Sequence, residues 1–273
     1  MKDYRDQIVA TEDPPSNGVN NPIHDALGAD AAGYKAALVT GVRTYGWAVQ
    51  TLTQALGTQW LDSGWVDFQL RRPLYAGETL SIRLHQAADH WMLACSAKDA
   101  EQERVVLEGS AGNGVAPWLQ DLDPPPVAAP LEALADLPSY DLSSVPLRVP
   151  LRPLGAYVSR ESAKNMVSED LGLSVEHYLG DGTAGYIHPY FLAGRVAPLT
   201  RHNFTYGPTI HARSQIQHVR EARSERETVI GAQIVDAYER NGHLYHVLDA
   251  VVSDDDGELA RLRHTSIFRP RGT

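Results

Sequence analysis

The sequence predicts an α+β fold made of two similar halves, each an antiparallel sheet wrapped around one central helix, with the two sheets joined side by side. Two observations lead to this prediction. One apolar helix followed by several strands occurs twice along the chain, and a proline- and alanine-rich segment separates the two copies. A helix followed by an antiparallel meander favours α+β over a parallel α/β fold. Two such units side by side would also protect each other's sheet edges.

The first half contains a predicted helix at residues 42–56, whose apolar side chains recur at intervals of three and four residues and form one stripe. These side chains are Val42, Tyr45, Val49, Leu52 and Leu56. Gly57 is a plausible residue for the helix to end on. Residues 65–72 then alternate between apolar and polar, which is typical of a half-buried strand. After a turn at residues 75–78, further strands are expected at 79–87, 90–97 and 105–112.

Residues 115–150 are rich in proline and alanine. Proline removes a backbone donor and restricts φ, so this stretch predicts neither a central strand nor a long helix. We interpret it as a semi-rigid linker between a first domain at residues 1–114 and a second at residues 151–273. The alternative is one long surface loop within a single domain.

The second half repeats the order of the first. Residues 188–200 have a helical pattern, and residues 254–257 (Asp-Asp-Asp-Gly) predict a turn. The strands expected around that turn are residues 209–218, 228–238, 244–253 and 259–268.

Composition limits the functional classes. Of the 273 residues, 43% are apolar and 21% are charged, an ordinary globular balance, and the net charge of −10 argues against nonspecific nucleic-acid binding. A single cysteine, Cys95, cannot form an internal disulfide. Residues 1–15 lack the apolar core of a signal peptide, and no stretch is apolar enough to span a membrane. These features predict a cytoplasmic protein.

Three segments of the first half carry a family resemblance. Residues 20–25 read Asn-Asn-Pro-Ile-His-Asp, residues 33–42 have a glycine near each end, and residues 70–80 read Leu-Arg-Arg-Pro-Leu-Tyr-Ala-Gly-Glu-Thr-Leu. Together they resemble the signature of MaoC-like dehydratases and (R)-specific enoyl-CoA hydratases, in which Asp-x-Asn-Pro-(Leu/Ile)-His precedes the central helix. The resemblance implies a double hot-dog fold and a hydro-lyase that acts on an enoyl or 3-hydroxyacyl thioester.

This chemistry needs a proton-transfer group and donors for the charge that develops on the thioester oxygen. A histidine suits the first role and backbone N–H groups at a helix start suit the second, so His24 and Gly41 are the candidates. By resemblance, Asn21 would support the loop or bind the catalytic water. The family's catalytic Asp falls five residues before the histidine, where this chain has Val19. His24 would then act alone, with Asp25, or with a residue from the other half.

The alternative for His24 is a loop histidine that caps a helix start near residue 26, with Asp25 at the helix N-terminus. Val42 and Tyr45 on the first helix are expected to line the acyl-binding site. The second half has no Asn-Pro-Ile-His motif, so it is expected to shape the acyl site, with His188 and Tyr190 at the start of its helix. The alternative for His188 is an N-terminal cap.

Other signals are weaker. We predict no metal and no cofactor; the substrate would be carried as a thioester of coenzyme A or of an acyl carrier protein. The five histidines of the second-half strands and turns lack tight metal-ligand spacing; they are His211, His218, His243, His246 and His264. Four arginines are candidates for binding coenzyme A phosphates or are a solvated strand face; they are Arg71, Arg72, Arg213 and Arg220.

Two alternative functions remain open. Val19 in the place of the expected acid favours a non-catalytic or repurposed acyl-binding protein. A hot-dog thioesterase would need a carboxylate on or beside the central helix, and neither residues 42–56 nor residues 188–200 contain one. The expected partner is a small acyl thioester, and a homodimer of double hot-dog chains is possible.

Overall fold

The computed structural model describes residues 2–14, 21–99, 102–174, 176–178, 185–205 and 207–272. Within these residues, ten strands form one antiparallel sheet in the order β1-β3-β4-β5-β2-β7-β10-β9-β8-β6. The strands are β1 (Asp3–Val9), β2 (Trp65–Leu70), β3 (Thr79–Ala87), β4 (His90–Asp99), β5 (Gln102–Gly112), β6 (Leu154–Val158), β7 (Ile210–His218), β8 (Arg226–Arg240), β9 (His243–Asp254) and β10 (Gly257–Arg269). The α-helices are α1 (Ala26–Ala31), α2 (Gly41–Leu56), α3 (Trp60–Ser63), α4 (Arg160–Asn165), α5 (Pro189–Gly194) and α6 (Val196–Asn203).

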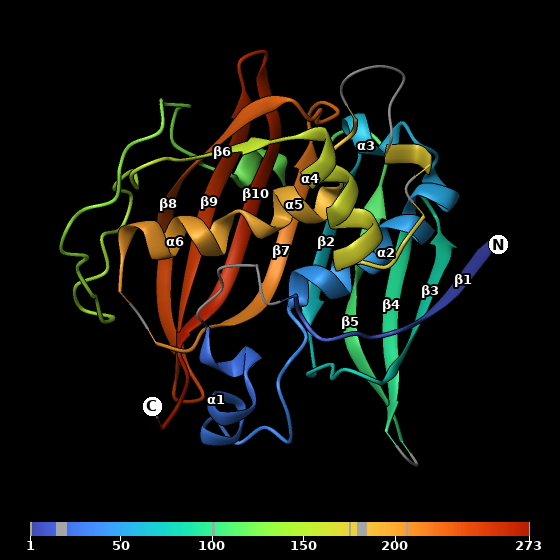
Figure 1. Ribbon diagram of the computed structural model, residues 1–273, viewed down its shortest axis with the longest axis horizontal. Coiled ribbons are helices and arrows are strands. Elements are labelled where there is room, and N and C mark those ends of the chain that lie inside the picture. Colours follow the sequence, from blue (N-terminus) through green and yellow to red (C-terminus); the bar gives the residue numbers. More distant parts are fainter. Residues whose placement is uncertain are drawn as a thin grey trace.

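The sheet reads the same from both ends. Each half contributes five strands, and the first, third, fourth, fifth and second strand of each half follow one another from the outer edge to the middle. Strand β2 of the first half pairs with β7 of the second, which makes one continuous sheet across the molecule (Figure 1). The repeated pattern of the sequence is therefore a repeated order of strands in space.

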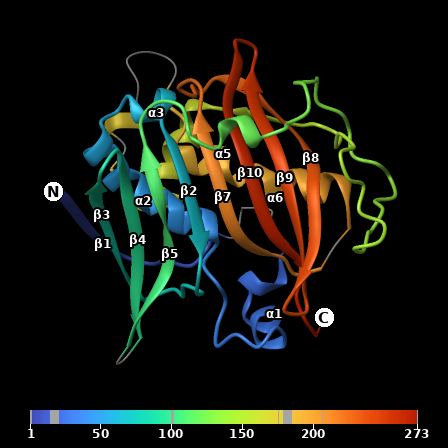
Figure 2. The same cartoon turned by 180° about the vertical axis from the view of Figure 1, so that it is seen from behind.

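Helices cover one face of this sheet, and the view from behind shows the strands of the opposite face (Figures 1 and 2). Helix α2 confirms the first predicted helix to within one residue. Tyr45, Val49, Leu52 and Leu56 are all buried against the sheet, as the apolar stripe predicts. The helix ends at Gly57, where φ is +83°, a conformation that favours glycine.

The second predicted helix is wrong in one respect: residues 188–200 do not form a single helix. Helix α5 ends at Gly194 and α6 begins at Val196. Pro198 explains the break, because a proline lacks the N–H that would bond to the carbonyl four residues earlier and its ring clashes with that carbonyl. The two pieces still follow one another across the same face of the sheet (Figure 1).

Residues 115–150 contain no strand, and their one helical element is the short 3-10 turn Leu119–Asp121. The segment runs along the second half, where the Arg148 N–H donates to a carbonyl of β8, as does the N–H of Leu151 directly after the segment. It passes beside β8 at the edge of the molecule (Figure 2). Among the described residues, none of the helices has the length and apolar character that a membrane crossing requires.

The two halves meet at β2 and β7, and Gln217 of β7 ties two further segments to this seam. Gln217 is 4% exposed. Its Nε2 group donates to the carbonyls of Ser63, Gly64 and Gly114 at 3.1–3.2 Å. Its Oε1 accepts from the Ala116 N–H at 2.7 Å. One side chain thus satisfies backbone groups from the α3 loop and from the start of the linker segment.

Replacing Gln217 with alanine should destabilise the protein by about 1–3 kcal/mol, because it leaves buried backbone groups without partners. Urea unfolding followed by fluorescence measures this loss. Gln7→Ala is the matched control, since Gln7 is exposed and its side chain donates to the Ser81 hydroxyl. Equal midpoints for the two variants would contradict the assigned role of Gln217.

Candidate functional site

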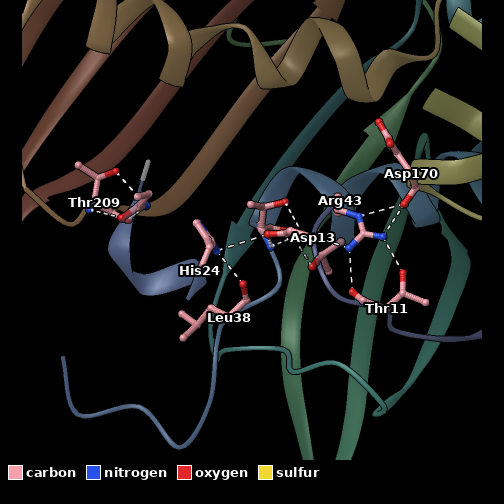
Figure 3. A network of polar contacts seen from close by, with 10 residues as sticks. Thr11, Asp13, His24, Leu38, Arg43, Asp170 and Thr209 are labelled. Carbon is pink, nitrogen blue, oxygen red and sulfur yellow. Dashed lines mark hydrogen bonds and ion pairs between the residues drawn. The ribbon is translucent and has the colours of Figure 1, made fainter. Parts of the chain in front are cut away.

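A buried arginine lies in the first turn of α2. Arg43 is 1% exposed, and its guanidinium lies over the Trp47 ring at 4.9 Å. It donates to the Thr11 carbonyl and hydroxyl at 2.7 Å each, to the Asp13 carboxylate at 3.1 Å, and to the Asp170 carbonyl (Figure 3). A buried charge needs this many partners, because desolvation otherwise makes it costly. Arg43 therefore fixes the segment before α1 and the C-terminal half on the start of α2.

The Asp13 carboxylate sits at the N-terminus of α2. It accepts from the Thr40 N–H at 3.0 Å and from the Thr40 hydroxyl at 3.3 Å, in addition to Arg43. A negative charge is favourable at this end of a helix. Its Oδ2 also lies 3.5 Å from Nδ1 of His24. Asp13 thereby links the helix start to the histidine of the Asn-Pro-Ile-His motif.

The His24 ring has a defined orientation. Its Nδ1 lies 2.6 Å from the Leu38 carbonyl oxygen, and the backbone pairs there too, since the Leu38 N–H donates to the Ile23 carbonyl at 3.0 Å. A carbonyl only accepts, so Nδ1 carries the proton, and in the neutral ring Nε2 then holds the lone pair. The side chain is 16% exposed. Within the described residues, Nε2 of His24 has no hydrogen-bond partner, so this nitrogen is available to accept a proton.

Asn21 and Asp25 flank the motif and have different partners. Asn21 exchanges hydrogen bonds with the backbone of Thr209, donating to its carbonyl at 2.7 Å and accepting from its N–H at 3.2 Å (Figure 3). Asn21 thereby ties the motif loop to the backbone of the second half. Asp25 is exposed and caps α1, accepting from the Gly28 N–H at 2.7 Å. Asp25 therefore lies at the helix N-terminus, as the alternative predicted, but the cap is Asp25 and not His24.

Gly41 is the first residue of α2. The third and fourth N–H groups of the helix donate to the Thr40 carbonyl, whereas those of Gly41 and Val42 meet no acceptor within the described residues. The position has room only for glycine: an added Cβ would lie 2.2 Å from a Leu70 methyl group and 3.0 Å from Nδ1 of His211. Two free donors at the positive end of a 16-residue helix can stabilise an oxyanion.

The remaining candidates lie where α2 and α5 cross. Tyr45 is fully buried, and its ring stacks on Phe68 at 4.9 Å. Burial, and to a lesser extent the nearby Tyr178, raises the pKa of the Tyr45 phenol well above its usual value. His188 caps α5, accepting from the Tyr190 N–H at 3.1 Å, as its alternative predicted. The structure thus divides the predicted site residues between the start of α2 and this crossing.

Reasoning from the sequence missed Asp13, Thr40 and Thr209. Asp13 belongs to no motif, and Thr209 contributes mainly its backbone, so neither left a signal. Arg43 did leave one: it is the one charged residue within the apolar helix pattern of residues 42–56. Val19, the residue at the family's acid position, lies outside the described residues.

Three of the four arginines considered for phosphate binding are in ion pairs. Arg71 pairs with Glu108 at 2.6 Å, and Arg213 pairs with Asp67 across the β2–β7 seam at 2.5 Å. Arg220 pairs with the buried Asp254. Guanidinium groups that are already paired are less available to coenzyme A phosphates, so these contacts favour the alternative of a solvated strand face.

Buried histidines line the inner face of the C-terminal half of the sheet, that is, the face that the helices cover. Burial lowers the pKa of His218 to about 4 and that of His264 to about 4. Burial, and then the neighbouring His264, lowers the pKa of His246 to about 3 and that of His211 well below its usual value. All four are therefore neutral near pH 7.

These histidines should make stability depend on pH. A folded pKa below the unfolded value of about 6.5 means that the unfolded chain binds more protons, so stability rises with pH. Between pH 6 and pH 5 the groups with folded pKa values of about 3 to 4 should together remove about 4 kcal/mol of unfolding free energy per pH unit. Urea unfolding at a series of pH values measures the slope. His264→Leu should reduce this slope by the contribution of one bound proton. An unchanged slope would show that His264 titrates normally in the folded protein.

Comparison by sequence finds no matching family model and no matching curated protein. Solved structures, in contrast, match over almost the whole chain. A putative MaoC domain dehydratase from Chloroflexus aurantiacus is 13% identical, with a TM-score of 0.66 and coverage of 99% of this chain and 95% of that one. A conserved hypothetical protein from Mycobacterium tuberculosis with a double hot-dog fold is 13% identical, with a TM-score of 0.60 and coverage of 92% and 87%.

A putative oleoyl thioesterase from Lactobacillus plantarum also matches, at 11% identity and a TM-score of 0.52, with coverage of 99% and 96%. Similarity at this level concerns the fold, which hosts more than one reaction. The chain therefore resembles MaoC-like dehydratases and double hot-dog proteins in structure, over nearly its full length, as the motif around His24 predicted.

Proposed function

We propose that this protein is a hydratase or dehydratase that adds water to an enoyl thioester or removes it from a 3-hydroxyacyl thioester. The observation that carries the proposal is the position of Asp13, which accepts a hydrogen bond from the Thr40 N–H at the start of α2 and lies 3.5 Å from the proton-bearing nitrogen of His24. The Asp13 carboxylate thereby lies beside both His24, the proposed base, and the helix start whose Gly41 and Val42 N–H groups are the proposed oxyanion donors. The structural similarity to MaoC-like dehydratases supports the same reaction class.

In the dehydration direction, Nε2 of His24 removes a proton from the α-carbon. The negative charge that moves onto the thioester oxygen is stabilised by the N–H groups of Gly41 and Val42. The resulting enolate expels the β-hydroxyl, which takes the proton back from Nε2 and leaves as water. The carbon–oxygen bond breaks, a carbon–carbon double bond forms, and His24 returns to its starting state. Hydration is the reverse sequence.

Asp13 acts here as a positioning residue. Its oxygens are occupied by donors from Thr40 and Arg43, so it is suited to stabilise the imidazolium form of His24 and not to exchange protons with substrate. In this proposal the acid that the family signature carries five residues before His24 is not needed for proton transfer. One histidine serves in turn as base and acid.

The division of labour extends to the whole chain. We assign the chemistry to residues 1–114 and treat residues 151–273 as a second hot-dog unit that supports the site, with residues 115–150 joining them. Asn21 and Thr209 form one such support between the halves. The thioester would be carried by coenzyme A or by an acyl carrier protein.

Purified protein mixed with crotonyl-CoA and longer enoyl-CoAs should consume the conjugated thioester, which is followed by its ultraviolet absorbance. His24→Ala should lower kcat/KM by about 10²–10⁴-fold, the usual contribution of proton transfer. Release of free thiol, measured in the same samples, would instead indicate the thioesterase alternative. An activity that survives in His24→Ala would remove the proposed base.

Asp13→Asn should lower kcat about 10–100-fold with less effect on KM, because the uncharged amide no longer stabilises the imidazolium. It should also destabilise the fold by about 3–5 kcal/mol, since Arg43 loses its buried counter-ion. Asp25→Asn is the matched control: it preserves an N-cap at an exposed position and should change kcat less than about twofold. Similar losses in both variants would contradict the role of Asp13.

A further inference from the structure

Four polar side chains form a continuous row on the inner face of the C-terminal sheet. They come from three adjacent strands, β7, β10 and β9 (Figure 1). Ser214 lies between two imidazoles, 2.8 Å from Nε2 of His211 and 3.1 Å from Nδ1 of His264. The two rings stack at 4.1 Å. His246 follows on the next strand. We call these four residues the histidine row.

The row places polar side chains in the buried interior. Buried aliphatic side chains lie on the same three strands, among them Ile216, Leu248 and Leu262. His264 is 4% and His246 is 2% exposed, yet Nε2 of each makes no hydrogen bond within the described residues. Within the described residues, Nδ1 of His211 is fully buried and also has no partner. A buried polar atom without a partner costs about as much as a lost hydrogen bond. These unpartnered nitrogens along the row point to a bound polar group.

The row leads away from the proposed reaction centre. Nδ1 of His211 would be 3.0 Å from a Cβ on Gly41, at the start of α2, and the His211 ring packs edge-on against Phe68 at 5.6 Å. From there the row crosses two strand spacings, about 10 Å, to His246. His246 is the last residue of the row, and its Nδ1 lies 2.5 Å from the Tyr140 hydroxyl. An acyl chain whose thioester sits at Gly41 would reach the row within a few carbons.

The chemistry of the row selects the ligand. Its imidazoles are neutral near pH 7, so it offers hydrogen bonds and no charge to a carboxylate. Ser214 has one hydrogen and two imidazole neighbours, so it can donate to either ring and accept from the other. The row can therefore present a donor or an acceptor to a ligand. Among the described residues, no group of three or more potential ligands is arranged to hold a metal ion.

We propose that the histidine row binds an uncharged oxygen, a hydroxyl or a carbonyl, on the acyl chain beyond its β-carbon, so that the preferred substrates are oxygenated acyl thioesters rather than plain saturated-tail ones. This inference rests on the proposed function for the position of the thioester at Gly41. It deepens that function by naming the substrate class.

Binding of saturated thioesters tests the row without any turnover. Isothermal titration would compare octanoyl-CoA with octanoyl-CoAs that carry one hydroxyl or one keto group at the fifth, sixth or seventh carbon. We expect at least one oxygenated ligand to bind about tenfold more tightly than octanoyl-CoA. His264→Leu should abolish this preference, and Ser214→Ala should reduce it. His264→Asn, which keeps hydrogen-bonding atoms at the position, should retain part of it.

His218→Leu is the matched control. His218 is also buried and neutral and lies on β7, but its ring packs against Trp60 at 4.8 Å, at the far end of the strand. It should keep the full preference. Equal binding of all ligands by the wild type, or the same preference in His264→Leu, would overturn the inference and leave the row as a structural feature.

The two proposals can fail separately. A preference for an oxygenated chain in a protein without hydration activity would retain the row and reject the proposed reaction. Hydration of enoyl-CoAs with no preference among the tails would do the opposite.

Discussion

The buried guanidinium of Arg43 is the interaction on which the site depends. Its five donors are met by the Thr11 carbonyl and hydroxyl, the Asp13 carboxylate and the Asp170 carbonyl, so segments from both halves converge on the first turn of α2. A cation at the positive end of a helix is unfavourable by itself. Asp13 offsets both the dipole and the desolvated charge. The same carboxylate then has a fixed oxygen to offer His24.

This arrangement explains how the Asn-Pro-Ile-His segment can be placed without an acid inside the motif. The histidine ring is oriented by a carbonyl, Leu38, and by a carboxylate that is itself held by Arg43 and Thr40. Orientation and tautomer are set by these contacts. A charged group anchored in the core can therefore serve a loop eleven residues further along the chain.

Most of the fold could be predicted from the sequence, because its inner strands and α2 bury one face and show that face as a periodic apolar pattern. Strands β1 and β6 were missed for a physical reason. They lie at the two outer edges of the sheet, where β1 is charged and alternates only between exposed and half-buried, and β6 has five residues. Charged or short edge strands discourage pairing between molecules, and that same character hides them from a search for hydrophobic alternation.

The site was less predictable, since several of its contacts use backbone atoms. His24, Asn21 and Gly41 were found through a motif. The partners of these residues include the Leu38 carbonyl and the Thr209 backbone, and Arg43 is held by the Asp170 carbonyl. A backbone group is present whatever the side chain is, so no residue type marks it.

The same reasoning accounts for the inequality of the two halves. The C-terminal half supports the site at Thr209 and Asp170 largely through main-chain oxygens and nitrogens, which constrain the path of the chain but leave its side chains free to change. It could lose the Asn-Pro-Ile-His motif and keep its supporting role, because the sheet order that places those backbone groups is retained. Where this half does place unusual side chains, in the histidine row, backbone support cannot be the reason for them, and a ligand that reaches past the start of α2 can.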